Sequence, residues 1–371
     1  MSNDPSFSTR DYFFDLPPEL IAAVPLAQRD ESRLLVVNRA AGTIEHRQIK
    51  DLPQILDSSY SLVANNTKVI RARLIGERVG TGGKVEFFLL RKATVNEGEL
   101  PRWHGLMKTG SKVSVGFEFV LKAGTENITG KVVNRTDTNA GAIFTAEFSR
   151  DPVEAQVGEV PLPPYIQAKL MESAGQPGGI LDLTSEKVLN EYNTLFASEE
   201  GSVAAPTAGR HFTPDLIELL KTLKIDWNEI TLHVGIGTFK PVVVNDLREH
   251  RMHAEMATIL PQTMRDLNKA KRTGKKILSV GTTTTRTLEG FTTEGKLASG
   301  TRDLDIFIYP GSGHEWKFVD AMLTNFHLPE STLLMMVSSF IGSRERTLEI
   351  YAEAIREKYR FYSYGDAMLI L

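Results

Sequence analysis

The chain has 371 residues, of which 41% are hydrophobic and 24% are charged, and its net charge is −3. This length and composition allow a well-buried core in two domains or one large domain, with no reason to expect extensive disorder. Cysteine is absent, which excludes disulfides, thiolate nucleophiles, cysteine-ligated zinc and cysteine-ligated iron–sulfur clusters.

The N-terminal segment, residues 1–10, is polar and lacks the apolar core of a signal peptide. The longest apolar runs, such as residues 333–337, are far too short to cross a bilayer. We therefore expect a cytoplasmic protein that makes no contact with membranes.

Positive charge is concentrated between residues 68 and 112, where ten Lys or Arg residues meet only four acidic ones. Such a local excess can attract phosphates through counterion release. An ordinary solvated basic face explains the cluster equally well. The candidate phosphate-binding cations are Lys68, Arg71, Arg73, Lys84 and Lys108.

Residues 71–148 have the pattern of an all-β segment. Short apolar or alternating runs predict strands at 84–90, 113–115, 117–121, 130–133 and 142–148. Many short strands with Gly-rich turns predict a small barrel or sandwich. The Gly-rich residues 80–83 precede a strand rather than a helix, so they predict a hairpin turn and not a phosphate-binding loop.

Elsewhere helical and strand patterns alternate, which predicts a three-layer α/β domain. Thr213 and Pro214 begin a helix as N-cap and first residue. Strands are expected at 230–234, 277–280, 306–309 and 364–371. Further helices are expected at 261–275, after the strand 277–280 as far as residue 288, and at 346–358. The expected domains are 1–70 plus 155–371, with 71–154 as an inserted β-barrel. Residues 167–184 are polar and contain Gly and Pro, so we expect a mobile loop there.

Two segments of the α/β domain join small or hydroxylated residues to a helix start. Backbone N–H groups near Thr282 and Thr283 could bind an anion, and Arg286 would add a bidentate cation. The alternative is N-capping by one threonine. Upstream, Thr207 and Gly209 let a ligand approach the backbone, and His211 could transfer protons. The alternative for that histidine is a surface or capping residue.

Two further segments end at the edge where open α/β sheets bind ligands. Around residues 231–238 the candidates are His233, Gly235, Gly237 and Thr238. The neighbouring His250, His253 and Glu255 have the spacing of an apparent metal cluster. No further ligand is in view, which favours polar contacts or a core histidine.

Residues 324–331 place a dense group of polar side chains between an apolar strand and an apolar helix. The candidates there are Asn325, His327, Glu330 and Ser331, although Glu330 or Ser331 alone could simply cap the helix. Aromatic residues between 359 and 364 could stack a base, but such stripes are more often core.

The exact residues of many blocks resemble the S-adenosylmethionine:tRNA ribosyltransferase-isomerase (QueA) family of queuosine synthesis. The blocks keep the family order: 62–74, 83–86, 161–166, 203–209 with 211–212, 231–235, 237–239, 252–255, 281–286, 306–311, 324–333 and 364–368. The resemblance implies an α/β domain interrupted by a β-barrel. It also implies transfer of the ribosyl group of S-adenosylmethionine to an aminomethyl-deazaguanine at the tRNA wobble position, which yields epoxyqueuosine and releases adenine and methionine.

The resemblance further implies tRNA and S-adenosylmethionine as partners, with no metal and no cofactor beyond the consumed S-adenosylmethionine. Under it the basic cluster becomes a candidate tRNA-binding surface. The oligomeric state is left as monomer or homodimer. Two positions depart from the family pattern: Arg210 replaces the usual Leu and Asn193 the usual Gln. With the long 167–184 segment, they leave room for a different acceptor or a non-catalytic tRNA-binding paralogue.

The implied chemistry needs a base for the acidic C5′ proton beside the sulfonium and a hydrogen-bond donor or acid for departing adenine. Without cysteine this chemistry must be polar rather than cluster-initiated. The candidate catalytic residues are His211, His233, His253 and His327, with Glu255 or Glu330 as a partner. Together with the strand-end groups, we expect them to share one pocket.

Overall fold

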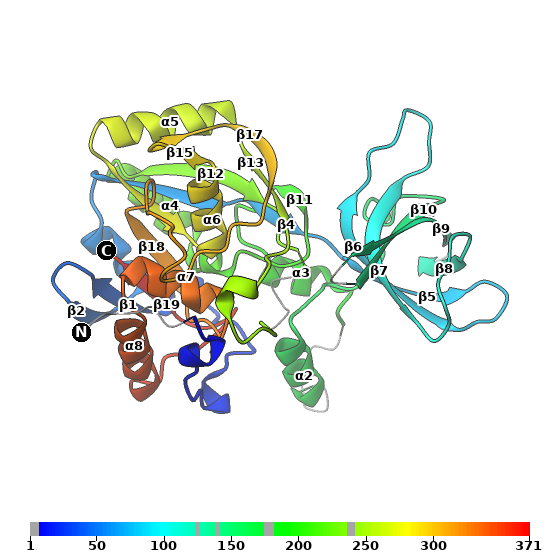
Figure 1. The fold of residues 1–371 in the computed structure, drawn as a ribbon, viewed down its shortest axis with the longest axis horizontal. Coiled ribbons are helices and arrows are strands. Elements are labelled where there is room, and N and C mark those ends of the chain that lie inside the picture. Colours follow the sequence, from blue (N-terminus) through cyan, green and yellow to red (C-terminus); the bar gives the residue numbers. More distant parts are fainter. Residues whose placement is uncertain (1–6, 124–125, 139–140, 174–181, 236–241) are drawn as a thin grey trace. The chain divides into compact units, whose positions relative to one another are not determined.

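The computed structural model describes residues 7–123, 126–138, 141–173, 182–235 and 242–371 (Figure 1). The chain divides into two compact units. The α/β unit contains residues 1–66, 194–198 and 206–371, and the barrel unit contains residues 67–193 and 199–205. The expected insertion, 71–154, spans the barrel strands. The compact barrel unit is larger, because residues 155–193 and 199–205 also belong to it.

A nine-stranded sheet forms the middle of the α/β unit, in the order β17-β13-β12-β3-β14-β18-β19-β1-β2. The strands β12, β3, β14 and β18 are parallel neighbours. The bounds are β1 Arg33–Asn38, β2 Thr43–Gln48, β3 Tyr60–Asn65, β12 Asp226–Leu232, β13 Glu255–Ile259, β14 Lys276–Val280, β17 Gly300–Leu304, β18 Ala321–Asn325 and β19 Ala367–Ile370.

Both faces of this sheet are covered. On one face Leu62 and Leu278 lie in register and pack in a common core with Phe212 and with Leu216 of α4 (Pro214–Thr222). Ser279 points to the opposite face, since side chains alternate along a strand, and its hydroxyl lies 2.8 Å from that of Thr285 in α6 (Thr282–Gly290). The predicted three-layer architecture is therefore confirmed.

The remaining helices are α1 Leu52–Ile55, α2 Pro164–Ser173, α3 Glu186–Tyr192, α5 Pro261–Arg272, α7 Thr332–Ile341 and α8 Arg344–Arg356. The 3-10 helices are η1 Thr9–Tyr12, η2 Pro18–Leu20, η3 Arg29–Glu31, η4 Ile49–Asp51, η5 Thr207–His211 and η7 Leu247–Glu249. Thr213 caps α4 as predicted, because its side chain accepts a bond from the backbone N–H of Leu216. No helix within the described ranges is both long enough and apolar enough to span a membrane.

The barrel unit contains a closed six-stranded barrel, in the order β10-β7-β6-β5-β8-β9. Phe87, Phe119 and Phe148 fill it, with ring centroids 5.7–5.9 Å apart. Gly130 leaves the room for this packing, since a Cβ there would lie 2.4 Å from the ring of Phe119. The bounds are β5 Arg73–Arg78, β6 Lys84–Lys92, β7 Arg102–Thr109, β8 Glu118–Ala123, β9 Glu126–Thr138 and β10 Gly141–Phe148. The predicted barrel and the hairpin turn at 80–83, which joins β5 to β6, are both confirmed.

Short two-stranded ladders complete the fold: β4 (Thr67–Val69) with β11 (Glu199–Ser202), and β15 (Thr292–Thr293) with β16 (Lys296–Leu297).

Three sequence predictions are wrong in part. Residues 113–115 form no strand, because Gly116 (φ 89°) turns the chain there and the Phe117 N–H bonds the Ser114 carbonyl. Residues 306–309 form no strand either. Their apolar character reflects packing, since the Phe307 ring meets His250 edge to face and lies tilted against Tyr309. Residues 167–173 of the expected mobile loop belong to α2. Residues 174–181 of that loop lie outside the described residues.

Candidate functional site

The carboxyl ends of four neighbouring strands meet along one edge of the large sheet. Asn65 ends β3, Leu232 ends β12, Val280 ends β14 and Asn325 ends β18. In open α/β sheets ligands bind at this edge. The strand-end segments predicted from the sequence therefore line one border of the α/β unit (Figure 1).

Asn65 connects three of these segments. Its amide donates to the Leu232 carbonyl (3.0 Å) and to the Thr283 hydroxyl (3.2 Å), and its Oδ1 accepts from the Leu232 N–H (3.0 Å). The side chain is buried. It fixes the start of α6 relative to the end of β12, a role that sequence reasoning missed. The signal was an amide at the end of an otherwise apolar buried strand.

The start of α6 carries no side-chain cap. Its N-cap residue is Gly281, with φ 90°, and no threonine caps the helix, so the capping alternative is wrong. The hydroxyls of Thr284 and Thr285 instead donate back to the carbonyls of Val280 (2.8 Å) and Gly281 (3.1 Å). The first-turn N–H groups keep the partial positive charge that attracts anions.

Arg286 and Glu255 form a buried ion pair behind this helix start. Arg286 Nη1 lies 2.7 Å from Glu255 Oε2, and Glu255 Oε1 accepts the Gly235 N–H at 2.8 Å. Both side chains are only 4% exposed, which makes this a desolvated pair. Nε and Nη2 of Arg286 are buried and have no hydrogen-bond partner among the residues that the structure describes. These two nitrogens form the side of a guanidinium that binds carboxylates or phosphates bidentately.

Glu255 therefore positions Arg286 and Gly235 rather than a metal. His253 is exposed, and the His250 ring packs edge to face against Phe307. Burial and the neighbouring His253 lower the pKa of His250 below its usual value. In the part of the chain that the structure describes, no group of three or more suitable side chains is placed to hold a metal ion.

The 3-10 helix η5 lies against the same helix start. A Cβ built on Gly281 would be 3.5 Å from the Cβ of Ala208, and η5 packs against β18. Thr207, half-buried, begins η5. Gly209 is required by packing, since a Cβ there would lie 2.8 Å from the Phe196 ring. Its proposed ligand contact has no support in this geometry.

His211 ends η5 with one ring nitrogen unused. The side chain is buried and hydrogen-bonds the backbone of Arg29, and within the described ranges Nε2 has no partner. The bond to Arg29 is therefore made by Nδ1, which leaves the lone pair on Nε2. Burial, and secondarily the charge of Arg210, lower the pKa of His211 to about 4. This histidine is neutral at physiological pH.

Arg210 is buried beside His211. Its guanidinium lies 4.3 Å from the centroid of the Tyr364 ring, and its Nη1 reaches the Ser363 carbonyl at 3.4 Å. Tyr359, Phe361 and Tyr364 are buried, so the core alternative is confirmed for these aromatic residues.

At the end of β18, Asn325 donates to the Tyr362 carbonyl (3.0 Å), and no described residue bonds its buried Oδ1. His327 Nε2 lies 2.9 Å from the Thr324 hydroxyl, and burial lowers the pKa of His327 to about 3. Ser331 caps α7 through the Leu334 N–H, as its structural alternative predicted. Glu330 adopts a positive φ of 57°, and its N–H bonds the Tyr12 carbonyl.

His233 directly follows Leu232, the last residue of β12. It is half-buried, and its backbone N–H donates to the Met256 carbonyl. Gly237 and Thr238 lie outside the described residues.

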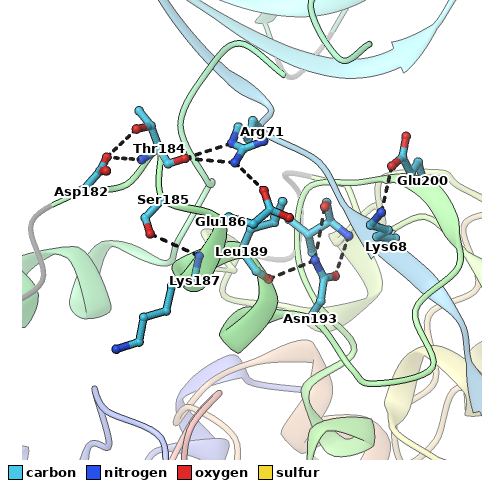
Figure 2. Close-up of polar contacts among 11 residues, drawn as sticks. Lys68, Arg71, Asp182, Thr184, Ser185, Glu186, Lys187, Leu189, Asn193 and Glu200 are labelled. Atoms are coloured by element: carbon cyan, nitrogen blue, oxygen red, sulfur yellow. Dashed lines mark hydrogen bonds and ion pairs between the residues drawn. The ribbon is translucent and has the colours of Figure 1, made fainter. Parts of the chain in front are cut away.

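The predicted tRNA-binding cations lie in the barrel unit, and most of them are already paired. Figure 2 shows Lys68 and Arg71 with their partners. Lys68 contacts Glu200 at 3.0 Å, and Arg71 contacts Glu186 at 2.9 Å and the Thr184 carbonyl at 3.0 Å. Arg73 bridges two carboxylates, from Glu86 and Glu159, each at 3.0 Å. Lys84 and Lys108 are exposed, with no ion-pair partner among the described residues. The pairing was invisible in the sequence, because most of the partners lie far along the chain.

Asn193, one of the two positions that depart from the family pattern, connects two elements through hydrogen bonds (Figure 2). Its Oδ1 accepts the Val69 N–H at 2.8 Å, and its Nδ2 donates to the carbonyls of Leu189 (3.2 Å) and Val69 (3.4 Å). The amide thereby joins α3 to β4 and is buried. It is unavailable to a substrate in this arrangement.

Comparison with known proteins adds independent information. A family model described as "Queuosine biosynthesis protein" matches residues 9–370. The S-adenosylmethionine:tRNA ribosyltransferase-isomerase of Clostridioides difficile (strain 630) is 42% identical, with 98% of this chain and 99% of that protein covered. The enzyme of the same name from Moorella thermoacetica is 45% identical, with 97% and 99% covered.

A crystal structure of S-adenosylmethionine tRNA ribosyltransferase from Thermotoga maritima is also similar. It is 33% identical, with a TM-score of 0.53, and the match covers 97% of this chain and 100% of that one. Model, sequences and structure agree over nearly the whole length, so the chain belongs to the queuosine biosynthesis protein family.

Proposed function

We propose that this protein transfers and isomerises the ribosyl group of S-adenosylmethionine onto the aminomethyl-deazaguanine at the wobble position of tRNA. The product is epoxyqueuosine in tRNA, with adenine and methionine released. Membership of the queuosine biosynthesis family over residues 9–370 carries this assignment. The sheet edge described above supports it, because anion-binding groups and a neutral histidine lie there.

The start of α6 suits the carboxylate of the methionine moiety. Uncapped first-turn N–H groups and the helix dipole favour a negative charge at that point. The free side of Arg286 supplies two further buried donors beside Gly235. A buried donor without a partner costs free energy, so a bound substrate oxygen there would restore the lost hydrogen bond.

His211 is the proposed base for the C5′ proton. The sulfonium makes this proton acidic, and Nε2 of His211 holds a lone pair that no protein group uses. Since its pKa is about 4, the ring stays deprotonated at neutral pH and is ready to accept a proton.

His327 has a different proposed role. Its pKa of about 3 makes it a poor acid at neutral pH, because almost none of it carries the second proton. We assign it to orienting β18 groups through Thr324 rather than to protonating adenine.

The direct test is to incubate the protein with S-adenosylmethionine and tRNA that carries the aminomethyl-deazaguanine. Adenine, methionine and a heavier tRNA nucleoside should appear together. Adenine release without tRNA would support another acceptor instead. Salt-sensitive tRNA binding with no affinity for S-adenosylmethionine would indicate a non-catalytic paralogue.

The proposal includes no cofactor besides the consumed S-adenosylmethionine. Turnover should therefore survive extended dialysis against a metal chelator, and a loss that added metal restores would contradict this part. A cytoplasmic location stays a prediction of the sequence.

A further inference from the structure

The edge of the large sheet opposite the candidate site carries a strong positive charge. Residues 269–276, at the end of α5 and the following loop, include five Lys or Arg and no acidic residue. Lys221 and Lys224 lie at the end of α4 and in the loop that follows it. A few cations at a helix C-terminus complement its dipole, but this cluster exceeds that need and extends over two loops.

The two loops are spatial neighbours. Lys224 precedes β12 and Lys275 precedes β14, and these strands flank β3. Lys275 Nζ donates to the Lys224 carbonyl at 3.3 Å and pairs with Asp226 at 2.7 Å. Lys271 pairs with Asp320 at 3.0 Å.

Other cations of this edge stay exposed. They have no ion-pair partner among the described residues: Lys221, Lys224, Lys269, Arg272 and Lys276. We call these five residues the basic edge. Unpaired cations gathered on one surface favour a polyanionic partner.

A cavity of about 600 Å³ adjoins the basic edge and shares Lys276 with it. Its lining includes Tyr60, Trp316 and Phe340, of which Trp316 is half-buried and the other two are buried. Lys276 Nζ lies 5.4 Å from the centroid of the Tyr60 ring, and Trp316 Nε1 is fixed to the Ser339 carbonyl at 3.2 Å. The volume lies within the range of small-molecule sites.

Arg39 makes this cavity rigid. Its guanidinium donates to the carbonyls of Phe340 (2.8 Å), Asp320 (2.7 Å) and Leu371 (3.3 Å) and lies 4.0 Å from the Phe340 ring centroid. An aromatic cavity next to exposed cations has the composition of sites that stack an unpaired base and hold the adjoining phosphates.

We propose that the basic edge and its cavity form a second RNA-binding surface, which holds phosphates on the cations and an unpaired base against Trp316. This surface lies at the amino ends of β3, β14 and β18, one strand length from the candidate site at their carboxyl ends. That separation is roughly 17 Å for a six-residue strand. A folded tRNA is several times longer, so one molecule can reach both edges. Only the identity of the RNA as tRNA rests on the proposed function.

The test compares two triple variants with equal charge change. Lys224→Gln, Arg272→Gln and Lys276→Gln alter the basic edge, whereas Lys50→Gln, Arg356→Gln and Lys358→Gln alter exposed cations of η4 and of α8 with its C-terminal end. Affinity for full-length tRNA is measured over a range of salt concentrations. The slope of log K against log salt should fall by about 2 in the first variant, since each lost phosphate contact removes roughly 0.7–0.9. The control variant should keep the original slope.

A second variant tests the cavity. Trp316→Leu keeps an apolar wall but removes the stacking ring, so affinity should fall about tenfold. The melting temperature of the variant shows whether its fold survives. A second measurement uses the unaltered protein and asks whether tRNA protects Trp316 from a soluble fluorescence quencher. This readout does not depend on the folding of the variant. Absent protection would overturn the base-stacking part.

Equal slopes for the two triple variants would overturn the proposal as a whole. The proposal would also be overturned if only the basic-edge variant changed its oligomeric state while its tRNA slope stayed unaltered. The surface would then be an interface between copies of the chain. Adenine release at saturating tRNA is measured in parallel and should be equal in all variants. Its absence from the unaltered protein would contradict the proposed function alone, because the binding slopes would still report on this surface.

Discussion

Individual residues decide how the candidate site could work, and His211 is the most informative of them. Its buried Nε2 lacks a partner, and burial sets its pKa to about 4. As a base it must be deprotonated, so activity is lost only when pH falls through that value. We expect kcat/KM to be flat between pH 6 and 8 and to decline below about pH 5.

Replacing His211 by Ala should lower kcat by roughly 100-fold or more, the usual contribution of a general base. Thermal stability should change less than activity, since the histidine makes only one hydrogen bond, to Arg29. A titration of the unaltered enzyme with an acidic midpoint near pH 6.5, the ordinary histidine value, would contradict the assignment.

Asn193 allows a test of whether its departure from the family pattern concerns substrate or fold. The amide is buried and bonds both Val69 and Leu189. Asn193→Gln adds a methylene to a closely packed position and should cost about 1–3 kcal/mol of unfolding free energy. The KM for tRNA should stay unchanged. A shifted KM with unchanged stability would instead place this residue in substrate recognition.

The site residues were predictable from the sequence in part. Strand ends and Gly- or Thr-rich helix starts pointed to Thr283, Arg286, His211 and Asn325. Asn65 was missed because its partners, Leu232 and Thr283, lie more than 160 positions away along the chain. The pairing of Arg286 with Glu255 was missed because it depends on how α6 packs near the start of β13, which no local pattern in the sequence shows.

At the scale of elements, helix ends follow local rules closely. Ser331 accepts the Leu334 N–H and donates to the Leu328 carbonyl at 2.7 Å. Ser331→Ala should destabilise the protein by about 1 kcal/mol, as measured by urea unfolding. If the hydroxyl only caps α7, affinity for S-adenosylmethionine is unaffected. A tenfold weaker affinity would give Ser331 the substrate-binding role that the sequence also allowed.

Glu289 of α6 makes the stability of the folded protein depend on pH. Burial would raise its pKa, but His314 Nε2 at 3.4 Å and hydrogen bonds from the N–H groups of Val319, Lys317 and Phe318 outweigh burial, and the pKa is lowered below 4.5. The folded pKa lies below the unfolded one, so the stabilisation is present above about pH 4.5 and is lost as pH falls through the folded value.

Glu289→Gln should therefore flatten the fall in stability on acidification. Unfolding midpoints between pH 3 and 7 for the variant and the unaltered protein provide the check. Parallel curves for the two proteins would show that another carboxylate controls the acid transition.

The errors at this scale come from predicting a strand wherever apolar residues cluster. Residues 306–309 are buried or half-buried without belonging to a ladder, whereas in 113–115 only Val113 is buried and Val115 is 61% exposed. The strands β5 and β7 were not singled out, since charged side chains interrupt their alternation. Burial can be read from composition, but the partner strand that defines a ladder cannot.

For the whole molecule, the sequence predicted the two-part architecture but not the course of the chain between the parts. The chain passes between the two units near residues 66, 193, 198 and 205. The later crossings depend on the ladder between β4 and β11, whose pairing of residues 67–69 with 199–202 has no local signature.

Charge on the barrel unit provides a prediction at this scale. Lys84 and Lys108 are exposed without ion-pair partners, whereas Arg73 is held by Glu86 and Glu159. Lys84→Ala with Lys108→Ala should weaken tRNA binding and reduce the salt slope by about 1–2. Arg73→Lys should affect stability more than the slope. If a salt titration instead shows a reduced slope for Arg73→Lys and an unchanged slope for the double variant, Arg73 makes the tRNA contact.

The position of β19 has a consequence for how the protein is made. Residues 367–370 pair with β18 on one side and β1 on the other, so they join the two halves of the sheet. The barrel strands are consecutive and can close while translation continues, but the α/β sheet must wait until the ribosome has added its last strand. A nascent chain stalled before residue 367 exposes two apolar strand edges. Such truncated chains should be targets for chaperones and proteases, even though they lack only a few residues.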